Sequence, residues 1–210
     1  SPVDVFFKPD GIKMYVLGDS GNGVNEYDLS TAWNISTASF LQVFSVSAQE
    51  VVPQGLFFKP DGTKMYIIGV VGDDVNEYDL STAWDISTAS YVQNFSVAAQ
   101  DTNPTNISFK PDGTRMFVVG YDNDAVSEYL LSSAWDISTA SYLQNFSVGA
   151  QQTQPQGLFF KADGLKMYVS GDNPDSIFQY TTGTGPTPAT IAYPASVDWP
   201  SGTAPDAPAD

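Results

Sequence analysis

The residues of this sequence that could bind a ligand or a metal ion are mostly Asp and Asn in short, glycine-rich segments. The candidate ligand-binding residues are Asp19, Asn22, Asp73, Asp74, Tyr121, Asp122, Asn123, Asp124, Asp172, Asn173 and Asp175. Carboxylate and amide oxygens suit sugar hydroxyls and hard cations such as calcium. Asp122 and Asp124 form the best single calcium candidate, although they lack the spacing of a twelve-residue calcium loop. The competing interpretation is that Asp, Asn and Gly simply make good turns.

The missing residue types exclude several kinds of chemistry. The 210-residue chain contains no His and no Cys, so it has no Ser-His-Asp or Cys-His pair, no zinc site of the usual kind and no disulfide. The formal net charge of −16 disfavours nucleic acid as a partner. No apolar stretch is long enough to span a bilayer, so we expect no membrane insertion.

A repeat of 51 residues organises the chain and must position these loops. Phe-Lys-Pro-Asp-Gly begins at Phe7, Phe58 and Phe109, and Phe-Lys-Ala-Asp-Gly begins at Phe160, so each start lies 51 residues after the last. Each complete copy contains four short runs of β-branched and aromatic residues and no long helical pattern, which predicts an all-β fold. Four strands in a repeat of about 50 residues are typical of a β-propeller blade.

The second copy shows the four expected strands best. They are Gly55–Lys59, Lys64–Ile68, Val75–Leu80 and Tyr91–Val97, called A to D in every copy. Pro60-Asp61-Gly62 fits a tight turn between strands A and B. Strands A and B carry apolar residues on both faces, so we expect them to be buried on both sides.

Two segments resemble known families. The hairpin sequence Phe-Lys-Pro-Asp-Gly-Thr-Lys-Met-Tyr resembles the A–B hairpin of YVTN-type β-propellers, and the longer unit with Val-Asn-Glu-Tyr-Asp-Leu-Ser-Thr-Ala-Trp is similar to repeats in marine bacteriophage and bacterial proteins. The segment 193–205 resembles a linker of bacteriophage tail-fibre proteins. The resemblance implies a propeller at a virion or extracellular surface.

The repeat boundaries predict the domain organisation. We expect a β-propeller over residues 1–181, with repeats 1–53, 54–104, 105–155 and 156–181, and a strand near residues 190–193 that completes the fourth blade. Residues 182–210 are rich in Pro, Ala and Gly and are predicted to form a linker, or a strap that lies against the propeller. The four blades form either a closed four-bladed ring or part of a larger propeller. We favour the ring, because an open stack exposes edges.

An antiparallel blade separates its loops into two ends. The A–B and C–D loops emerge at one end and are nearly identical between copies, whereas the B–C and D–A loops emerge at the other and vary. All eight basic residues flank the A–B turns, so the variable end has no Lys or Arg and is acidic. The candidate ligand-binding residues belong to this variable end. The repeated Glu-Tyr pairs of strand C and the repeated Trp of each C–D loop are interpreted as scaffold.

The sequence favours a non-catalytic binding module. Its ligand is predicted to be a host cell-surface glycan or protein, and neighbouring virion proteins and further copies in a fibre are alternative partners. A purely structural spacer or assembly module is the second hypothesis. An enzyme, such as a glycosidase or lyase with a carboxylate pair near the axis, ranks last because the repeat supplies near-copies of the same groups. Glu50, Asp101 and Tyr121 are interpreted as residues unique to one copy.

Overall fold

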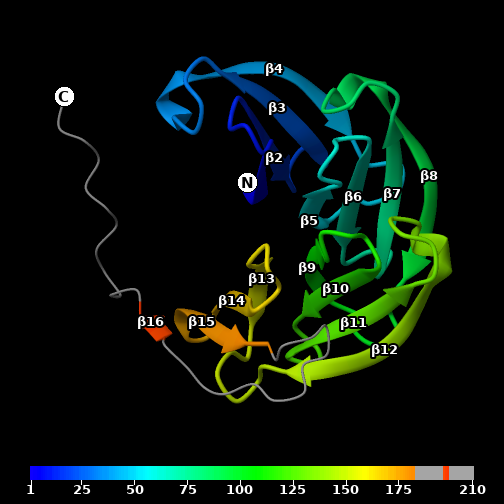
Figure 1. The fold of residues 1–210 in the computed structure, drawn as a ribbon, viewed down its shortest axis with the longest axis vertical. Coiled ribbons are helices and arrows are strands. Elements are labelled where there is room, and N and C mark those ends of the chain that lie inside the picture. Colours follow the sequence, from blue (N-terminus) through cyan, green and yellow to red (C-terminus); the bar gives the residue numbers. More distant parts are fainter. Residues whose placement is uncertain (183–195, 199–210) are drawn as a thin grey trace.

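The computed structural model describes residues 1–182 and 196–198. Four blades of four antiparallel strands are arranged in a ring, as a four-bladed β-propeller (Figure 1). In the described residues the only helices are the three-residue 3₁₀ segments η1 (Ile35–Thr37), η2 (Ile86–Thr88) and η3 (Ile137–Thr139). None of the helices described has the length and apolarity of a membrane-spanning segment. The all-β, four-bladed prediction is confirmed.

The strands follow the repeat in chain order. Blade 1 contains β1 (Pro2–Phe7), β2 (Lys13–Gly18), β3 (Gly23–Leu29) and β4 (Ala38–Ser45). Blade 2 contains β5 (Pro53–Phe58), β6 (Lys64–Gly69), β7 (Asp74–Leu80) and β8 (Ala89–Ser96). Blade 3 contains β9 (Pro104–Phe109), β10 (Arg115–Gly120), β11 (Ala125–Leu131) and β12 (Ala140–Ser147). Blade 4 contains β13 (Pro155–Phe160), β14 (Lys166–Asp172), β15 (Asp175–Thr181) and β16 (Ser196–Asp198).

Sequential strands pair in every blade, so each blade is a meander that runs outward from the axis. The bounds of β5 to β8 agree with the expected strands to within two residues. Blade 4 is completed by β16, which pairs with β15. The expected strand at residues 190–193 lies outside the described residues.

The C–D loop of each of the first three blades folds its Trp over the A–B turn of the same blade. Gly62 has a φ of +75°, and a Cβ at this position would lie 2.4 Å from the ring of Trp84. Trp84 itself adopts a φ of 68°, a region that non-glycine residues seldom occupy. Trp33 covers Gly11 and Trp135 covers Gly113 in the same way. The interpretation of these Trp residues as plugs is therefore confirmed.

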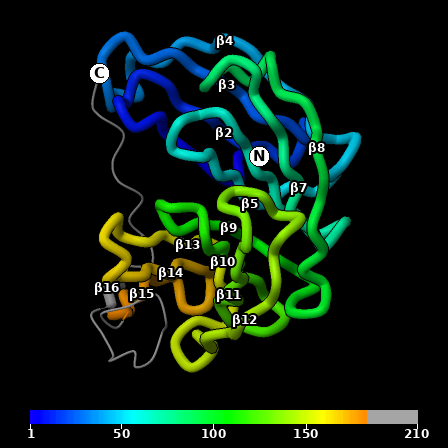
Figure 2. The backbone as a smooth tube through the Cα atoms, turned by 45° about the vertical axis from the view of Figure 1, so that its right-hand side comes forward, coloured from blue at the N-terminus to red at the C-terminus, as the bar shows by residue number. Residues whose placement is uncertain are grey.

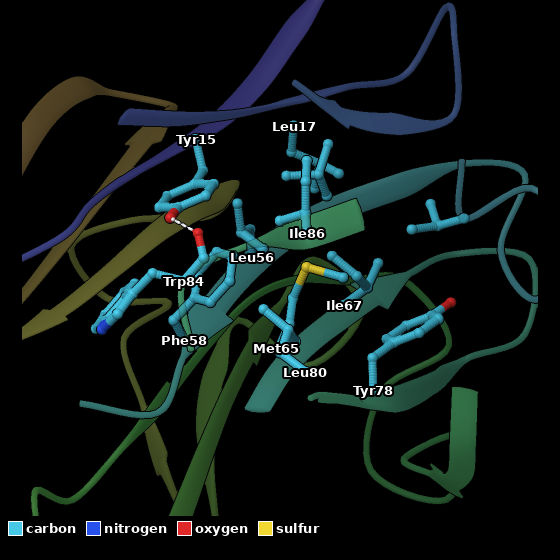
Figure 3. Close-up of a cluster of buried hydrophobic side chains, with 12 residues drawn as sticks. Tyr15, Leu17, Leu56, Phe58, Met65, Ile67, Tyr78, Leu80, Trp84 and Ile86 are labelled. Atoms are coloured by element: carbon cyan, nitrogen blue, oxygen red, sulfur yellow. Dashed lines mark hydrogen bonds between the residues drawn. The ribbon is translucent and has the colours of Figure 1, made fainter. Parts of the chain in front are cut away.

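Trp84 and Trp135 also join neighbouring blades. The ring of Trp84 stacks on Phe6 and Tyr15 of blade 1, and the Tyr15 hydroxyl donates a 2.6 Å hydrogen bond to the Trp84 carbonyl (Figure 3). Tyr66 bonds the Trp135 carbonyl at the next interface, also at 2.6 Å. The core is thus divided into clusters that lie between blades 1 and 2, 2 and 3, and 3 and 4.

A buried carboxylate at the first two interfaces fixes one blade to the next. Glu26 accepts hydrogen bonds from Lys13 Nζ at 2.5 Å and Gln42 Nε2 at 2.8 Å within blade 1. It also accepts the backbone N–H of Ile86, in blade 2, at 3.2 Å. Glu77 makes the equivalent three contacts, reaching Ile137 of blade 3. A buried charge needs such partners, and the scaffold interpretation of the Glu-Tyr pairs is confirmed.

The junction between blade 4 and blade 1 differs from the other three. In Figures 1 and 2, blade 1 and blade 4 form the two ends of the series of blades. Across the described residues, no hydrogen bond, aromatic contact or hydrophobic cluster links these two blades. The inner strand β1 is accordingly only partly buried, whereas every residue of β9, between two neighbours, is buried.

Candidate functional site

The variable end of the propeller carries the candidate site. At the opposite end, each of the four A–B turns holds a Lys–Asp ion pair, as in Lys59–Asp61 at 2.7 Å. Lys64 further pairs with Glu77 at 2.5 Å and with Asp79 at 2.6 Å. All eight Lys and Arg residues flank the A–B turns at that end. The B–C and D–A loops therefore contain no Lys or Arg and form an acidic surface.

Each B–C loop of blades 2 to 4 is held by one buried side chain from the preceding D–A loop. Glu50 accepts the backbone N–H groups of Val52, at 2.6 Å, and Gly72, at 3.3 Å. Asp101 accepts those of Asn103, Asp122 and Asn123. Gln152 accepts those of Gln154 and Asn173 and donates to the Pro174 carbonyl. We call these three residues the loop anchors.

The loop anchors correct the interpretation of Glu50 and Asp101 as residues unique to one copy. Positions 50, 101 and 152 are separated by 51 residues, so they are one repeat position occupied by Glu, Asp and Gln. What the three side chains share is a buried oxygen that accepts backbone N–H groups. Glycine at the end of strand B makes room for them, since a Cβ at Gly69 or Gly120 would lie 2.4 Å from the anchor.

Three predicted site residues also share one repeat position and shape the B–C turns. Asn22, Asp73 and Asp124 have φ values of 45°, 48° and 45°, a region that Asn and Asp tolerate well. Their carbonyls accept the N–H groups of Val46, Val97 and Val148, which ties each B–C turn to the D–A loop that follows. The interpretation of these residues as turn formers therefore explains their backbone conformation. Burial also raises the pKa of the Asp124 carboxyl.

Other predicted residues divide between internal and exposed positions. Asp74 is buried and accepts hydrogen bonds from Asn76 and Asn94, so its side chain is committed to the blade. Asp19 accepts hydrogen bonds from Ser1 and Ser20 and lies at the surface. Asp175 is exposed, and its backbone lies opposite that of Asp172 in the β14–β15 hairpin.

Two predicted residues from different blades come together around a residue that the sequence did not single out. Gln156 Nε2 lies 2.6 Å from the hydroxyl of Tyr121 in blade 3 and 2.6 Å from Asp172 Oδ2 in blade 4. Gln156 and Asp172 are exposed, and Tyr121 is half-buried. We call Tyr121, Gln156 and Asp172 the interblade cluster. It places an aromatic ring beside a carboxylate and an amide, a combination that suits a sugar or another polyhydroxyl ligand.

The calcium candidate lies in the B–C loop of blade 3. Asp122 Oδ2 accepts a hydrogen bond from the Thr102 hydroxyl, and the backbone of Asp122 and Asn123 is held by Asp101. In the part of the chain that the structure describes, no group of three or more acidic side chains is placed to hold a metal ion. Calcium at Asp122 and Asp124 stays a prediction. Asn173 donates from Nδ2 to Thr153 at 3.0 Å and lies at the surface of the blade 4 loop.

One carboxylate lies at the axis, where the inner strands meet. Asp4 of β1 accepts hydrogen bonds from the backbone N–H of Leu56 in β5, at 2.7 Å, and from Asn106 Nδ2 in β9, at 3.3 Å. Burial raises the pKa of Asp4 to about 6. Its repeat equivalents are Gly55, Asn106 and Gly157, so the axis is asymmetric. The 51-residue spacing of the sequence already shows that this repeat position holds different residue types. Only the fold shows that the position faces the axis.

Comparison with known proteins supports the fold. No family model and no curated protein matches the sequence. Among solved structures, a protein from Lactobacillus plantarum is similar with 16% identity and a TM-score of 0.64, over 93% of this chain and 54% of that one. A putative 6-phosphogluconolactonase from Bacteroides fragilis has 16% identity and a TM-score of 0.61, over 91% of this chain and 52% of its own.

A third similar structure is named as a propeller. The Swd1 β-propeller domain of Myceliophteria thermophila has 12% identity and a TM-score of 0.55, over 93% of this chain and 59% of that one. At these identities the similarity shows the fold alone. The chain spans about half the length of the solved structures that it matches.

Proposed function

We propose that this chain is a non-catalytic recognition module that binds a polar surface ligand, a glycan or a protein, through its B–C and D–A loops. The observation that carries the proposal is the set of loop anchors. Loops that differ in sequence, such as 69–74 and 120–125, are held on one frame by equivalent buried acceptors. A fixed frame with variable tips lowers the entropic cost of binding, as preorganised loops do.

The interblade cluster is the part of this surface that we propose contacts the ligand. The Tyr121 ring offers an apolar face, and Gln156, which lies between the Tyr121 hydroxyl and Asp172, offers hydrogen bonds together with that carboxylate. The setting that we propose is a phage tail fibre or another extracellular or virion surface. Support for that setting comes from the sequence resemblance of the repeat and of residues 193–205, which lie mostly outside the described residues.

A structural spacer is the alternative function, and an enzyme is disfavoured. The groups that contact Asp4 at the axis are two backbone amides and the Asn106 side-chain amide. Glycosidases use two carboxylates about 5 to 10 Å apart, whereas this axial position carries Asp in blade 1 and Gly, Asn and Gly in the others.

Binding to a glycan array and to bacterial cells tests the proposal. We expect the intact protein to bind a restricted set of glycans or cells, and Tyr121→Ala to weaken that binding by about tenfold or more, as loss of an aromatic contact does. Asp163→Asn, at the opposite end of the propeller, is the matched control and should leave binding unchanged. Repeating the measurement with calcium and with a chelator tests the predicted calcium site. A blank result on arrays and cells would favour the spacer.

A further inference from the structure

Blade 1 presents an interface group that has no blade to pack on. Trp33 and Ile35 occupy the repeat positions of Trp84 and Ile86, which dock blade 2 on blade 1. Trp33 is 59% exposed and Ile35 is 64% exposed, whereas Trp84 is 8% exposed and Ile86 is fully buried. Phe7 packs on Trp33 with ring centroids 5.4 Å apart, so the group is already assembled.

Blade 4 presents the other half of the same interface. Phe159, Tyr168 and Gln179 occupy the positions at which Phe6, Tyr15 and Glu26 of blade 1 receive the loop of blade 2. Phe159 is 64% exposed, although Phe6 and Phe57 at the same position are partly buried beneath the Trp of the next blade. In the described part of the chain, no hydrogen bond or hydrophobic cluster joins blade 1 to these residues.

The internal interfaces define how the two free halves fit each other. Tyr168 retains the hydroxyl that, in Tyr15 and Tyr66, donates to the carbonyl of the docking Trp at 2.6 Å. Gln179 retains an oxygen that can accept the Ile35 N–H, as Glu26 accepts the Ile86 N–H at 3.2 Å. Phe159 is placed to stack on Trp33, as Phe57 does on Trp135. The contact would continue an interface that this chain already forms.

We infer that a second copy of this chain supplies the missing partner, with blade 4 of each copy receiving blade 1 of the other. The two halves belong to one chain, yet they do not meet among the described residues. The blades superpose on proteins about twice as long, with 93% of this chain covering 54% of one of them. Two head-to-tail copies provide a comparable number of residues and two equivalent junctions, which closes the assembly.

Sedimentation velocity and native mass spectrometry of the whole chain test the inference. We expect a concentration-dependent dimer. Trp33→Asp and Phe159→Asp should each weaken dimerisation by roughly 30-fold or more, because each removes an aromatic anchor from both junctions. Phe40→Asp is the control, since Phe40 is 58% exposed on the outer strand β4, away from the junction.

Mixing the two variants makes the test specific for head-to-tail packing. A heterodimer of Trp33→Asp and Phe159→Asp has one junction intact and both substitutions in the other, so the mixture should dimerise more strongly than either variant alone. This result also excludes misfolding as the cause of the loss. A monomer at all concentrations, a dimer insensitive to both substitutions, growth into longer polymers, or no recovery on mixing would overturn the inference.

Discussion

Replacing Trp84 by Ala is expected to lower the free energy of unfolding by roughly 3–5 kcal/mol, the usual cost of removing a buried aromatic side chain. The ring fills the space above Gly62 and stacks on Phe6 of the neighbouring blade, so the substitution opens a cavity that the backbone cannot close. A loss of this size is a large part of the 5–15 kcal/mol that is typical of a folded domain.

Trp33→Ala is the matched comparison, because Trp33 covers Gly11 within its own blade and is exposed on the side where Trp84 meets blade 1. We expect it to cost about 1 kcal/mol, within the range of partly exposed substitutions. Urea denaturation followed by tyrosine and tryptophan fluorescence, at protein concentrations low enough to keep the chain monomeric, measures both. Equal losses for the two variants would show that the interblade contact contributes little to stability.

The fold could be predicted from the sequence because its determinants are local and repeated. The turn at Pro60-Asp61-Gly62 and the apolar runs on either side of it define a hairpin without any long-range information. Repetition at a fixed spacing then determines the number of blades. The packing of Trp84 on its own turn glycine was also predictable, but its second role, on the blade before it, depends on how blades are placed side by side.

The candidate site was less predictable, and the loop anchors show why. Glu50, Asp101 and Gln152 differ in charge and size, so comparing residue types between the copies did not show that they share one repeat position. In the structure, all three have the same role, because each buries an oxygen that accepts backbone N–H groups. Gln156 was missed for another reason. It lies in blade 4 with Asp172 and joins that residue to Tyr121 of blade 3, and the sequence does not specify which loops of neighbouring blades touch.

The junction between blade 4 and blade 1 could not be predicted from the sequence, because it depends on how the blades are placed around the axis. The first three copies carry the same Trp loop and predict equivalent interfaces, and the exposure of Trp33 and Phe159 could not be anticipated from them. Residues equivalent to those that stabilise the first two internal interfaces remain exposed at the two ends, where they can form a further interface.

The axial carboxylate leads to the second large effect, a stability that falls as the pH rises. Burial raises the pKa of Asp4 from the ordinary value of 3.8 to about 6 in the folded protein. Below about pH 3 the carboxyl of Asp4 is protonated in both states, and its burial then has no ionic cost. Between pH 4 and 6 the folded state binds more protons than the unfolded state, so the free energy of unfolding decreases with pH, by about 3 kcal/mol at most above pH 6.

Asp4→Asn is therefore expected to stabilise the protein above pH 6 and to remove this slope, because an amide can accept the Leu56 N–H without ionising. Urea denaturation at pH 4, 5, 6 and 7 measures the difference, and a carboxyl NMR titration of the parent protein checks the pKa directly. Asp10→Asn is the control of opposite sign. The hydrogen bond from Lys8 lowers the pKa of Asp10, so its contribution is present above pH 4 and is lost as the pH falls. If Asp4→Asn leaves the pH profile unchanged, the axial carboxylate is solvated and the proposed cost of burying its charge is wrong.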